Sequence, residues 1–180
     1  TGLQWLIDGF SQNYIPKESL EWKEEDGRNA FESGNLLFYR QWPYQYANNK
    51  KSLGPDKFDV AALPSIDGKP FVATLGGHNC AITKGSKNKA TALKFVKWWI
   101  NEDSQRYQLK TQANAPILGS LYDDPELLKE FPYLPILKKS LENAKSRPQA
   151  VYYGDVTAKI QDSIYPAIQQ PGSQSSKDVI

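Results

Sequence analysis

The one histidine and the one cysteine of this sequence stand two positions apart, at His78 and Cys80. In a strand, that spacing puts both side chains on one face, within possible contact. A Cys–His nucleophile also needs an orienting third group and an oxyanion hole, and no motif in the sequence supplies them. One histidine with one cysteine is also too few ligands for a structural zinc site. We therefore interpret Cys80 as a small buried apolar residue, and we expect no metal and no cofactor.

Two pairs of adjacent carboxylates, Glu24-Glu25 and Asp123-Asp124, are the other groups that could perform acid–base chemistry. A glycosidase needs two carboxylates that face each other across a cleft, and adjacency in sequence does not indicate this. The first pair is typical of a loop or a helix entry, and Asp124 before Pro125 is typical of a helix N-cap. No Gly-rich strand-to-helix turn carries the lysine and serine of a phosphate-binding loop. No motif among these residues indicates an enzyme, and nothing in their spacing alone dictates a function.

The composition of the 180-residue chain is globular, with 39% hydrophobic and 23% charged residues, which excludes a disordered or low-complexity class. The net charge of +2 is too small to indicate a nucleic-acid partner, and we interpret the Lys50-Lys51 and Lys138-Lys139 pairs as solvated. No apolar run approaches the roughly 20 residues of a membrane helix. The chain lacks methionine and starts inside an apolar pattern at Thr1. We therefore expect it to be part of a longer protein.

Apolar spacing predicts several helices. Leu3, Leu6, Ile7 and Phe10 recur on one helical face, and the same reasoning gives a helix over Lys89–Asn101. Further helices are predicted around 30–31 before Gly34, after Pro43, over 104–110, from Asp124-Pro125, and around 137–144 and 156–168.

Four short apolar runs predict strands. They are Leu36–Tyr39, Phe58–Pro64, Phe71–Leu75 and Asn79–Thr83, with Gly76-Gly77 between the last two. Helices mixed with short, separated strands favour an α/β fold.

Three stretches in order resemble the C-terminal half of family 1 extracellular solute-binding proteins, the maltose- and trehalose/maltose-binding type. The first is Phe31-Glu32-Ser33-Gly34-Asn35-Leu36-Leu37-Phe38 running into Trp42-Pro43. The second is Val60-Ala61-Ala62-Leu63-Pro64, then Phe71 to Ile82, then Ser86-Lys87-Asn88-Lys89 with Ala92, Phe95 and Trp98-Trp99. The third is Ser146-Arg147-Pro148 with Tyr152-Tyr153. The resemblance covers nearly all of the chain. His78 stands where many relatives carry tryptophan.

The resemblance implies a periplasmic-binding-protein-like fold of type II, with two α/β lobes around a ligand cleft. It implies that this chain supplies the C-terminal lobe and part of the first lobe. By position, residues 1–70 would form the first part of the second lobe, and 71–75 would be a hinge crossing. Residues 76–112 would belong to the first lobe, 113–118 would cross back, and 119–180 would finish the second lobe. Closure of such a cleft is a hinge motion.

The same resemblance implies six ligand-binding residues: Trp42, Tyr44, Gly76, Gly77, His78 and Arg147. Sugars present apolar C–H faces and polar hydroxyl rims, so a sugar site needs flat aromatic rings and fixed hydrogen-bonding groups. The glycine pair would let the backbone approach the ligand, and the guanidinium would donate to adjacent hydroxyls or to an anion. Core packing of Trp42, a simple turn at the glycines and a surface salt bridge of Arg147 stay open as alternatives.

The function implied by the resemblance is that of an extracytoplasmic receptor, in the periplasm or lipid-anchored on the cell surface. Such a receptor binds a small molecule, here a sugar or oligosaccharide, and hands it to the membrane permease subunits of an ABC importer. Two alternatives remain open at this point. One is a carbohydrate-active enzyme domain, and the other is a surface lipoprotein without a role in transport.

Overall fold

The computed structural model describes residues 2–65, 68–69, 71–173 and 176–179. The predicted chain ends at Thr1 and Ile180, and the lobe boundary at Pro70, lie outside the described residues. The chain divides into two compact units, the first made of Thr1–Tyr39 with Pro148–Ile180 and the second of Arg40–Arg147. The lobe boundaries given above stay a prediction, because a compact unit of chain is not the same thing as one wall of a ligand cleft.

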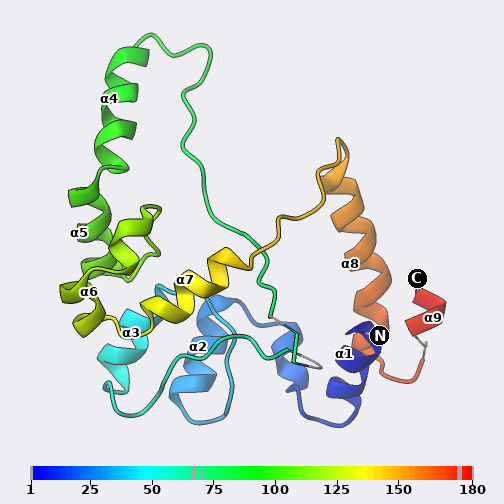
Figure 1. Cartoon of the computed structure of the whole chain (residues 1–180). Coiled ribbons are helices and arrows are strands. Elements are labelled where there is room, and N and C mark those ends of the chain that lie inside the picture. The colour runs from blue at the N-terminus through cyan, green and yellow to red at the C-terminus, as the bar shows by residue number, and fades with distance from the viewer. Residues whose placement is uncertain (1, 66–67, 70, 174–175, 180) are drawn as a thin grey trace. The chain divides into compact units, whose positions relative to one another are not determined.

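Helices dominate the described residues (Figure 1). The α-helices are α1 Gly2–Ser11, α2 Glu24–Glu32, α3 Gln45–Ser52, α4 Lys89–Trp99, α5 Glu102–Gln112, α6 Pro125–Glu130, α7 Leu134–Glu142, α8 Tyr153–Gln169 and α9 Ser176–Val179, and the short 3-10 helices are η1 Lys17–Leu20 and η2 Gly119–Tyr122. The predicted helices are confirmed to within a few residues at their ends. Ala144, predicted inside a helix, lies two residues beyond the end of α7.

The four predicted strands are wrong for this structure, because within the described residues the only β pairing is one parallel bridge, Thr74 with Lys145. A strand needs a neighbour for its backbone N–H and C=O groups. The run at 36–39 packs back on α2 instead, where Tyr39 stacks on Phe31 at 5.8 Å and donates to the Glu24 carbonyl at 2.7 Å.

The other three segments predicted as strands make different contacts in the structure. Phe58 packs against Tyr46 at 5.3 Å between ring centroids, and Val60 contacts the buried core. The run at 71–75 makes the single bridge. The run at 79–83 has no ladder among the described residues, and Cys80 is exposed there. The prediction that Cys80 is buried is therefore wrong, because this segment pairs with no strand in the part of the chain that the structure describes.

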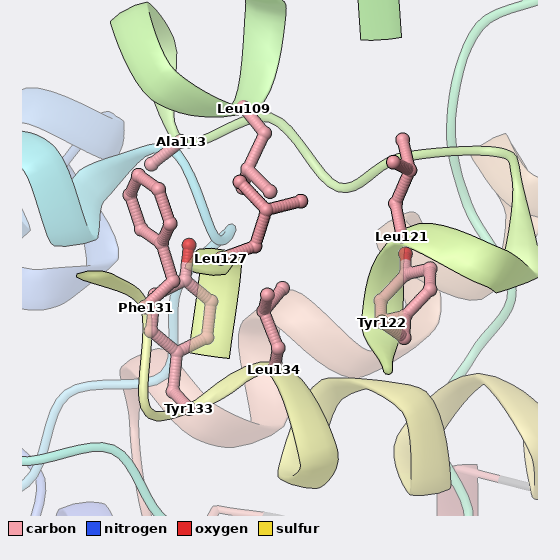
Figure 2. Close-up of a cluster of buried hydrophobic side chains, with 8 residues drawn as sticks. All are labelled: Leu109, Ala113, Leu121, Tyr122, Leu127, Phe131, Tyr133 and Leu134. Atoms are coloured by element: carbon pink, nitrogen blue, oxygen red, sulfur yellow. The ribbon is translucent and has the colours of Figure 1, made fainter. Parts of the chain in front are cut away.

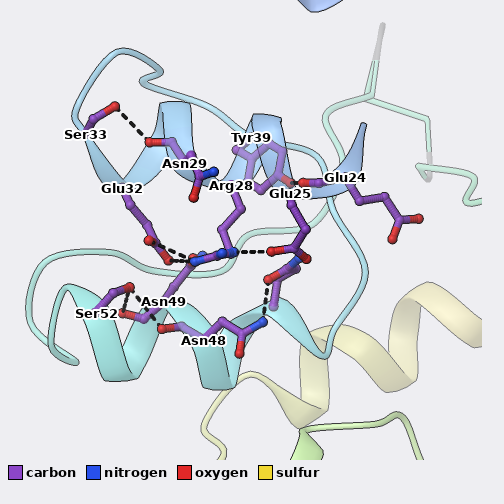
Figure 3. A network of polar contacts seen from close by, with 11 residues as sticks. Glu24, Glu25, Arg28, Asn29, Glu32, Ser33, Tyr39, Asn48, Asn49 and Ser52 are labelled. Carbon is purple, nitrogen blue, oxygen red and sulfur yellow. Dashed lines mark hydrogen bonds and ion pairs between the residues drawn. The ribbon is translucent and has the colours of Figure 1, made fainter. Parts of the chain in front are cut away.

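In the first unit, α1 packs against α8 and α9, with Ile7, Phe10 and Ala167 buried. Three carboxylates in the first turn of α2 suit its positive end. Arg28 on the same helix pairs with Glu25 at 2.7 Å and with Glu32 at 3.0 Å (Figure 3). Of the two alternatives predicted for the Glu24-Glu25 pair, a loop or a helix entry, the structure shows the helix entry.

The core of the second unit is a cluster of buried side chains from α5 to α7 (Figure 2). It consists of Leu109, Ala113, Leu121, Tyr122, Leu127, Phe131, Tyr133 and Leu134. Tyr46 of α3 packs on it through Tyr133, with ring centroids 4.4 Å apart. Burial raises the pKa of Tyr122 to about 12, since the charged phenolate would lose its hydration.

Two polar caps fix the helices that carry this core. Asn101 Oδ1 accepts from the Ser104 N–H at 2.8 Å and starts α5. Asp124 Oδ1 accepts from the N–H groups of Glu126 and Leu127 at 2.9 and 3.1 Å and starts α6. Arg106 of α5 then pairs with Asp124 at 2.8 Å, which ties the two helices together. The predicted cap role of Asp124 is confirmed.

Large apolar side chains remain exposed on α4. Phe95, Trp98 and Trp99 lie within about 6 Å of one another and form an aromatic cluster on the helix surface. Among the residues that the structure describes, no helix combines the length and the apolar character that crossing a bilayer would require.

Candidate ligand-binding site

The site begins at a close approach between Trp42 and Gly76. A Cβ atom added to Gly76 would lie 2.8 Å from Trp42 Cη2 and 3.3 Å from Cζ3. Carbon atoms pack at about 3.5–4.0 Å, so only glycine admits the indole at this distance. The Trp42 side chain remains 49% exposed, which leaves part of the ring open to a ligand.

Backbone hydrogen bonds around the start of α3 hold Trp42 in this place. Gln41 Oε1 accepts from the Trp42 N–H at 2.8 Å. The Trp42 carbonyl accepts from the Gln45 N–H at 3.2 Å, and the Pro43 carbonyl accepts from Tyr46 at 3.0 Å. Gln45 itself is buried. The tryptophan therefore sits on a turn whose far end is anchored by a packed helix.

Gly77 differs from Gly76 in what restricts it. Its φ of +142° is a backbone conformation that residues with a side chain rarely adopt, and a Cβ there would meet nothing within 4 Å. His78 follows on exposed, irregular backbone. The glycine pair thus combines a close approach at Gly76 with a special backbone angle at Gly77.

The bridge between Thr74 and Lys145 lies two residues before Gly76 on one segment and two residues before Arg147 on the other. The Leu75 N–H donates to the Lys145 carbonyl at 2.8 Å, and the Lys145 N–H donates to the Ala73 carbonyl at 2.9 Å. In a parallel pair, advancing two residues on each segment keeps them level. The register therefore predicts that Gly76 lies opposite Arg147, although the two are far apart in sequence.

Tyr44 faces a hollow of about 280 Å³ between the start of α3 and the end of α5. Its lining residues are Tyr44, Ala47, Asn48, Thr111, Gln112 and Asn114. The second wall is set by α5, whose C-cap residue Ala113 has a left-handed conformation with φ of 53°. This wall and α3 come from segments far apart in sequence.

Buried polar bonds position the segment that follows α5. The Tyr122 hydroxyl donates to the Pro116 carbonyl at 2.6 Å. Gln105, itself buried, accepts from the Ile117 N–H at 3.0 Å through Oε1. These two bonds fix the chain from Asn114 onward and so fix the wall of the hollow.

All six residues predicted for the site lie in the second unit. The structure places Trp42 against the backbone of Gly76, with Gly77 and His78 directly after that glycine, and it places Tyr44 at the hollow. Arg147 lies two residues beyond Lys145, which bridges to Thr74. That all six bind one ligand stays a prediction. The sequence interpretation missed Asn48, Thr111, Gln112 and Asn114, and the signal it passed over was a group of carboxamides next to the predicted crossing at 113–118.

The chemistry available at these residues is recognition by hydrogen bonding and stacking. The hollow is lined by hydroxyl, carboxamide, methyl and phenol groups. Within the described ranges, no group of three or more His, Cys, Asp or Glu side chains is placed to hold a metal ion.

Comparison with known proteins identifies the family and the fold. Residues 3–136 match the family model described as bacterial extracellular solute-binding protein. In Deinococcus radiodurans, a protein named "Probable ABC transporter-binding protein" is 32% identical over 167 residues, covering 90% of this chain and 40% of that protein. The maltotriose-binding protein of Pyrococcus abyssi is 24% identical over 208 residues, covering 94% of this chain and 46% of that protein.

A solved structure gives the fold. The maltose-bound MalE3 of T. maritima superimposes with a TM-score of 0.88 at 30% identity, covering 98% of this chain and 46% of that one. The chain thus spans less than half the length of each of these three proteins. The likeness confirms the predicted type II periplasmic-binding-protein-like fold, of which this chain is a part. With the family model matched over 3–136, the chain belongs to the bacterial extracellular solute-binding proteins.

Proposed function

We propose that this chain is the C-terminal portion of an extracytoplasmic receptor that binds a sugar or oligosaccharide and delivers it to the permease of an ABC importer. The observation that carries the proposal is the half-exposed Trp42 indole held against the bare backbone of Gly76. An exposed aromatic face on a rigid support is what the C–H face of a sugar ring packs against. Similarity to a maltose-bound protein supports the same ligand class.

In the proposed receptor, the six predicted residues divide the work. Trp42 stacks on the sugar ring, and Tyr44 borders the neighbouring hollow. Gly76 and Gly77 bring backbone N–H and C=O groups within reach of hydroxyls. His78 and Arg147 add hydrogen-bond donors at the rim. The ligand is bound and released without a chemical step.

The bridge at Thr74 and Lys145 supports a hinge in this region. A single bridge holds the 71–75 crossing beside the segment of Lys145 but leaves the backbone on either side of it free to turn. We propose that 71–75 is one crossing and 113–118 another, with closure around the ligand as the bound state. The family to which the chain belongs supports an extracytoplasmic location, in the periplasm or at the cell surface on a lipid anchor.

Calorimetry on the full-length receptor with maltose, maltotriose and trehalose tests the proposal, together with chromatography of the recovered sugar. Saturable binding of an unchanged sugar is expected. The Trp42→Ala variant should bind about 1–3 kcal/mol more weakly, the scale of a lost aromatic contact with its buried area. Turnover of the oligosaccharide would favour the enzyme alternative, and an unchanged dissociation constant in the variant would reject the role of Trp42.

A further inference from the structure

The hollow beside Tyr44 has a chemical character of its own. It is formed entirely within the second unit, by residues 44–48 at the start of α3 and residues 111–114 at the end of α5. We propose that it is a subsite for one ring of a neutral, polyhydroxylated ligand, next to the Trp42 platform. This inference rests on the proposed function for the identity of the ligand as a sugar.

Charge selects the ligand class. The six lining side chains are all uncharged: one phenol, one methyl, one hydroxyl and three carboxamides. An ionic group is held best by a charged partner of opposite sign. The lining offers none, so a carboxylate, phosphate or ammonium group is disfavoured relative to a hydroxyl.

The C-terminal end of α5 further disfavours binding of an anionic ligand in the hollow. Thr111 and Gln112 lie in its last turn, where carbonyl groups have no partner within the helix. The C-terminal end of a helix carries partial negative charge. Hydroxyl donors suit such an end, whereas an anionic group placed there would be repelled.

The hydrogen bonds that the carboxamides make within the protein leave some of their donor and acceptor groups available to a ligand. Asn48 spends an N–H on Gln45 Oε1 at 2.8 Å, so its own carbonyl oxygen remains an acceptor. Asn114 spends an N–H on Gln112 Oε1 at 2.8 Å, which leaves the Asn114 oxygen as an acceptor and the Gln112 amide N–H groups as donors. Sugar hydroxyls are at once donors and acceptors, so a polyol satisfies this mixed lining.

Size limits the ligand to about one ring. Pockets for small molecules commonly enclose about 300–1,000 Å³, and this hollow encloses about 280 Å³. Ala47 and the Tyr44 ring supply apolar surface for a C–H face. Tyr44 is two residues from Trp42 in sequence, so a ligand longer than one ring can contact both places.

The test is NMR titration of the ¹⁵N-labelled 180-residue chain with D-glucose, maltose and glucose 6-phosphate. We expect saturable shifts of the backbone amides of 44–48 and 111–114 with both neutral sugars. Glucose 6-phosphate should bind at least about fivefold more weakly than glucose, since its charge has no partner there. Absence of shifts at these amides, or equal or tighter binding of the phosphate, overturns the proposal.

Two variants test where the sugar binds, and a third variant serves as a matched control. Asn48→Leu and Gln112→Leu keep side-chain size and remove hydrogen bonds, and each should weaken glucose binding about five- to tenfold. Gln108→Leu changes the same residue type one turn earlier on α5, outside the hollow, and should leave the affinity unchanged. If a leucine variant disturbs the fold, the wild-type shift map still decides the question.

The titration also separates this inference from the proposed function. Shifts at the Trp42 indole N–H without shifts at 44–48 and 111–114 would remove the subsite and leave the receptor proposal standing. Shifts in the hollow without a change at Trp42 would keep the subsite and remove Trp42 as the platform. A chain that responds to neither neutral sugar would contradict both.

Discussion

Trp42 lies so close to Gly76 that its Cη2 would be 2.8 Å from a methyl group at that position. The contact joins a turn before α3 to the segment that bridges to Lys145. It explains in physical terms why tryptophan and glycine belong together here: one end of the indole lies where a side chain at position 76 would be, and only glycine leaves that space open.

Gly76→Ala should push the Trp42 ring off its support. Trp42 is 49% exposed, so its ring can swing outward. Inserting a methyl group into a packed core typically costs about 1–3 kcal/mol in the free energy of unfolding, and the cost here should be smaller. The indole N–H resonance should shift, and maltose binding by the full-length receptor should weaken. Gly85→Ala is the matched control, since a Cβ there meets nothing within 4 Å. Equal effects of the two substitutions would show that the contact does not matter.

Leu127→Ala should cost about 2–5 kcal/mol in the free energy of unfolding, because it opens a cavity in the core of the second unit. Leu127 is fully buried among residues from α5 to α7. Leu37→Ala removes the same number of atoms from a side chain that is 83% exposed and should change stability by less than about 0.5 kcal/mol. Urea unfolding followed by circular dichroism measures both. Similar midpoints for the two variants would contradict the assigned core.

Acid should weaken the link between α5 and α6. The Arg106 guanidinium and the N–H groups of Leu127 and Glu126 lower the pKa of Asp124 from 3.8 to about 2. A carboxyl whose folded pKa is depressed stabilises the protein fully above its unfolded pKa and ceases to do so as the pH falls through the folded pKa. The window for this loss is therefore about pH 4 down to about pH 2.

Asp124→Asn isolates this charge, because asparagine also caps helices well. Between pH 4 and pH 2 the melting temperature of the variant should fall less steeply than that of the wild type. Asp56→Asn, at an exposed turn position, is the control and should follow the wild-type slope. Parallel curves for Asp124→Asn and the wild type would refute the role of the ion pair.

The sequence predicted those parts of the fold that depend on neighbouring residues. Asp124 is a favourable N-cap residue and Pro125 a favourable first helical residue, so together they indicate a helix start. The apolar spacing from Leu3 to Phe10 indicates one face of a helix. The strand at 36–39 could not be judged in this way, since β pairing depends on a distant partner. Tyr39 found its contact on α2 instead.

The site shows the same division. The resemblance supplied Trp42 and Gly76, but their contact joins segments far apart in sequence, and only tertiary structure reveals it. The hollow was missed because Asn48 and Gln112 carry no signal by themselves. Carboxamides are common on helix surfaces, and they become a site only when α3 and α5 set them opposite one another.

The last prediction concerns affinity in the 180-residue chain alone. In the proposed two-lobed receptor, affinity comes from closing both walls around the ligand, which removes water and satisfies hydroxyls from two sides. This chain spans 46% of the maltose-bound relative, and in the proposed receptor the remaining residues form most of one wall. Each hydrogen bond lost with that wall costs about 1 kcal/mol.

Several such losses should take a micromolar receptor to roughly millimolar, since about 1.4 kcal/mol corresponds to a tenfold change. The binding that remains should be that of Trp42 and the hollow, so it should favour single rings and gain little from longer oligosaccharides. Calorimetry with glucose, maltose and maltotriose on the chain and on the full-length receptor, side by side, measures both effects. Micromolar binding by the chain alone would mean that these 180 residues already hold the whole site, and the requirement for a second wall would have to be abandoned.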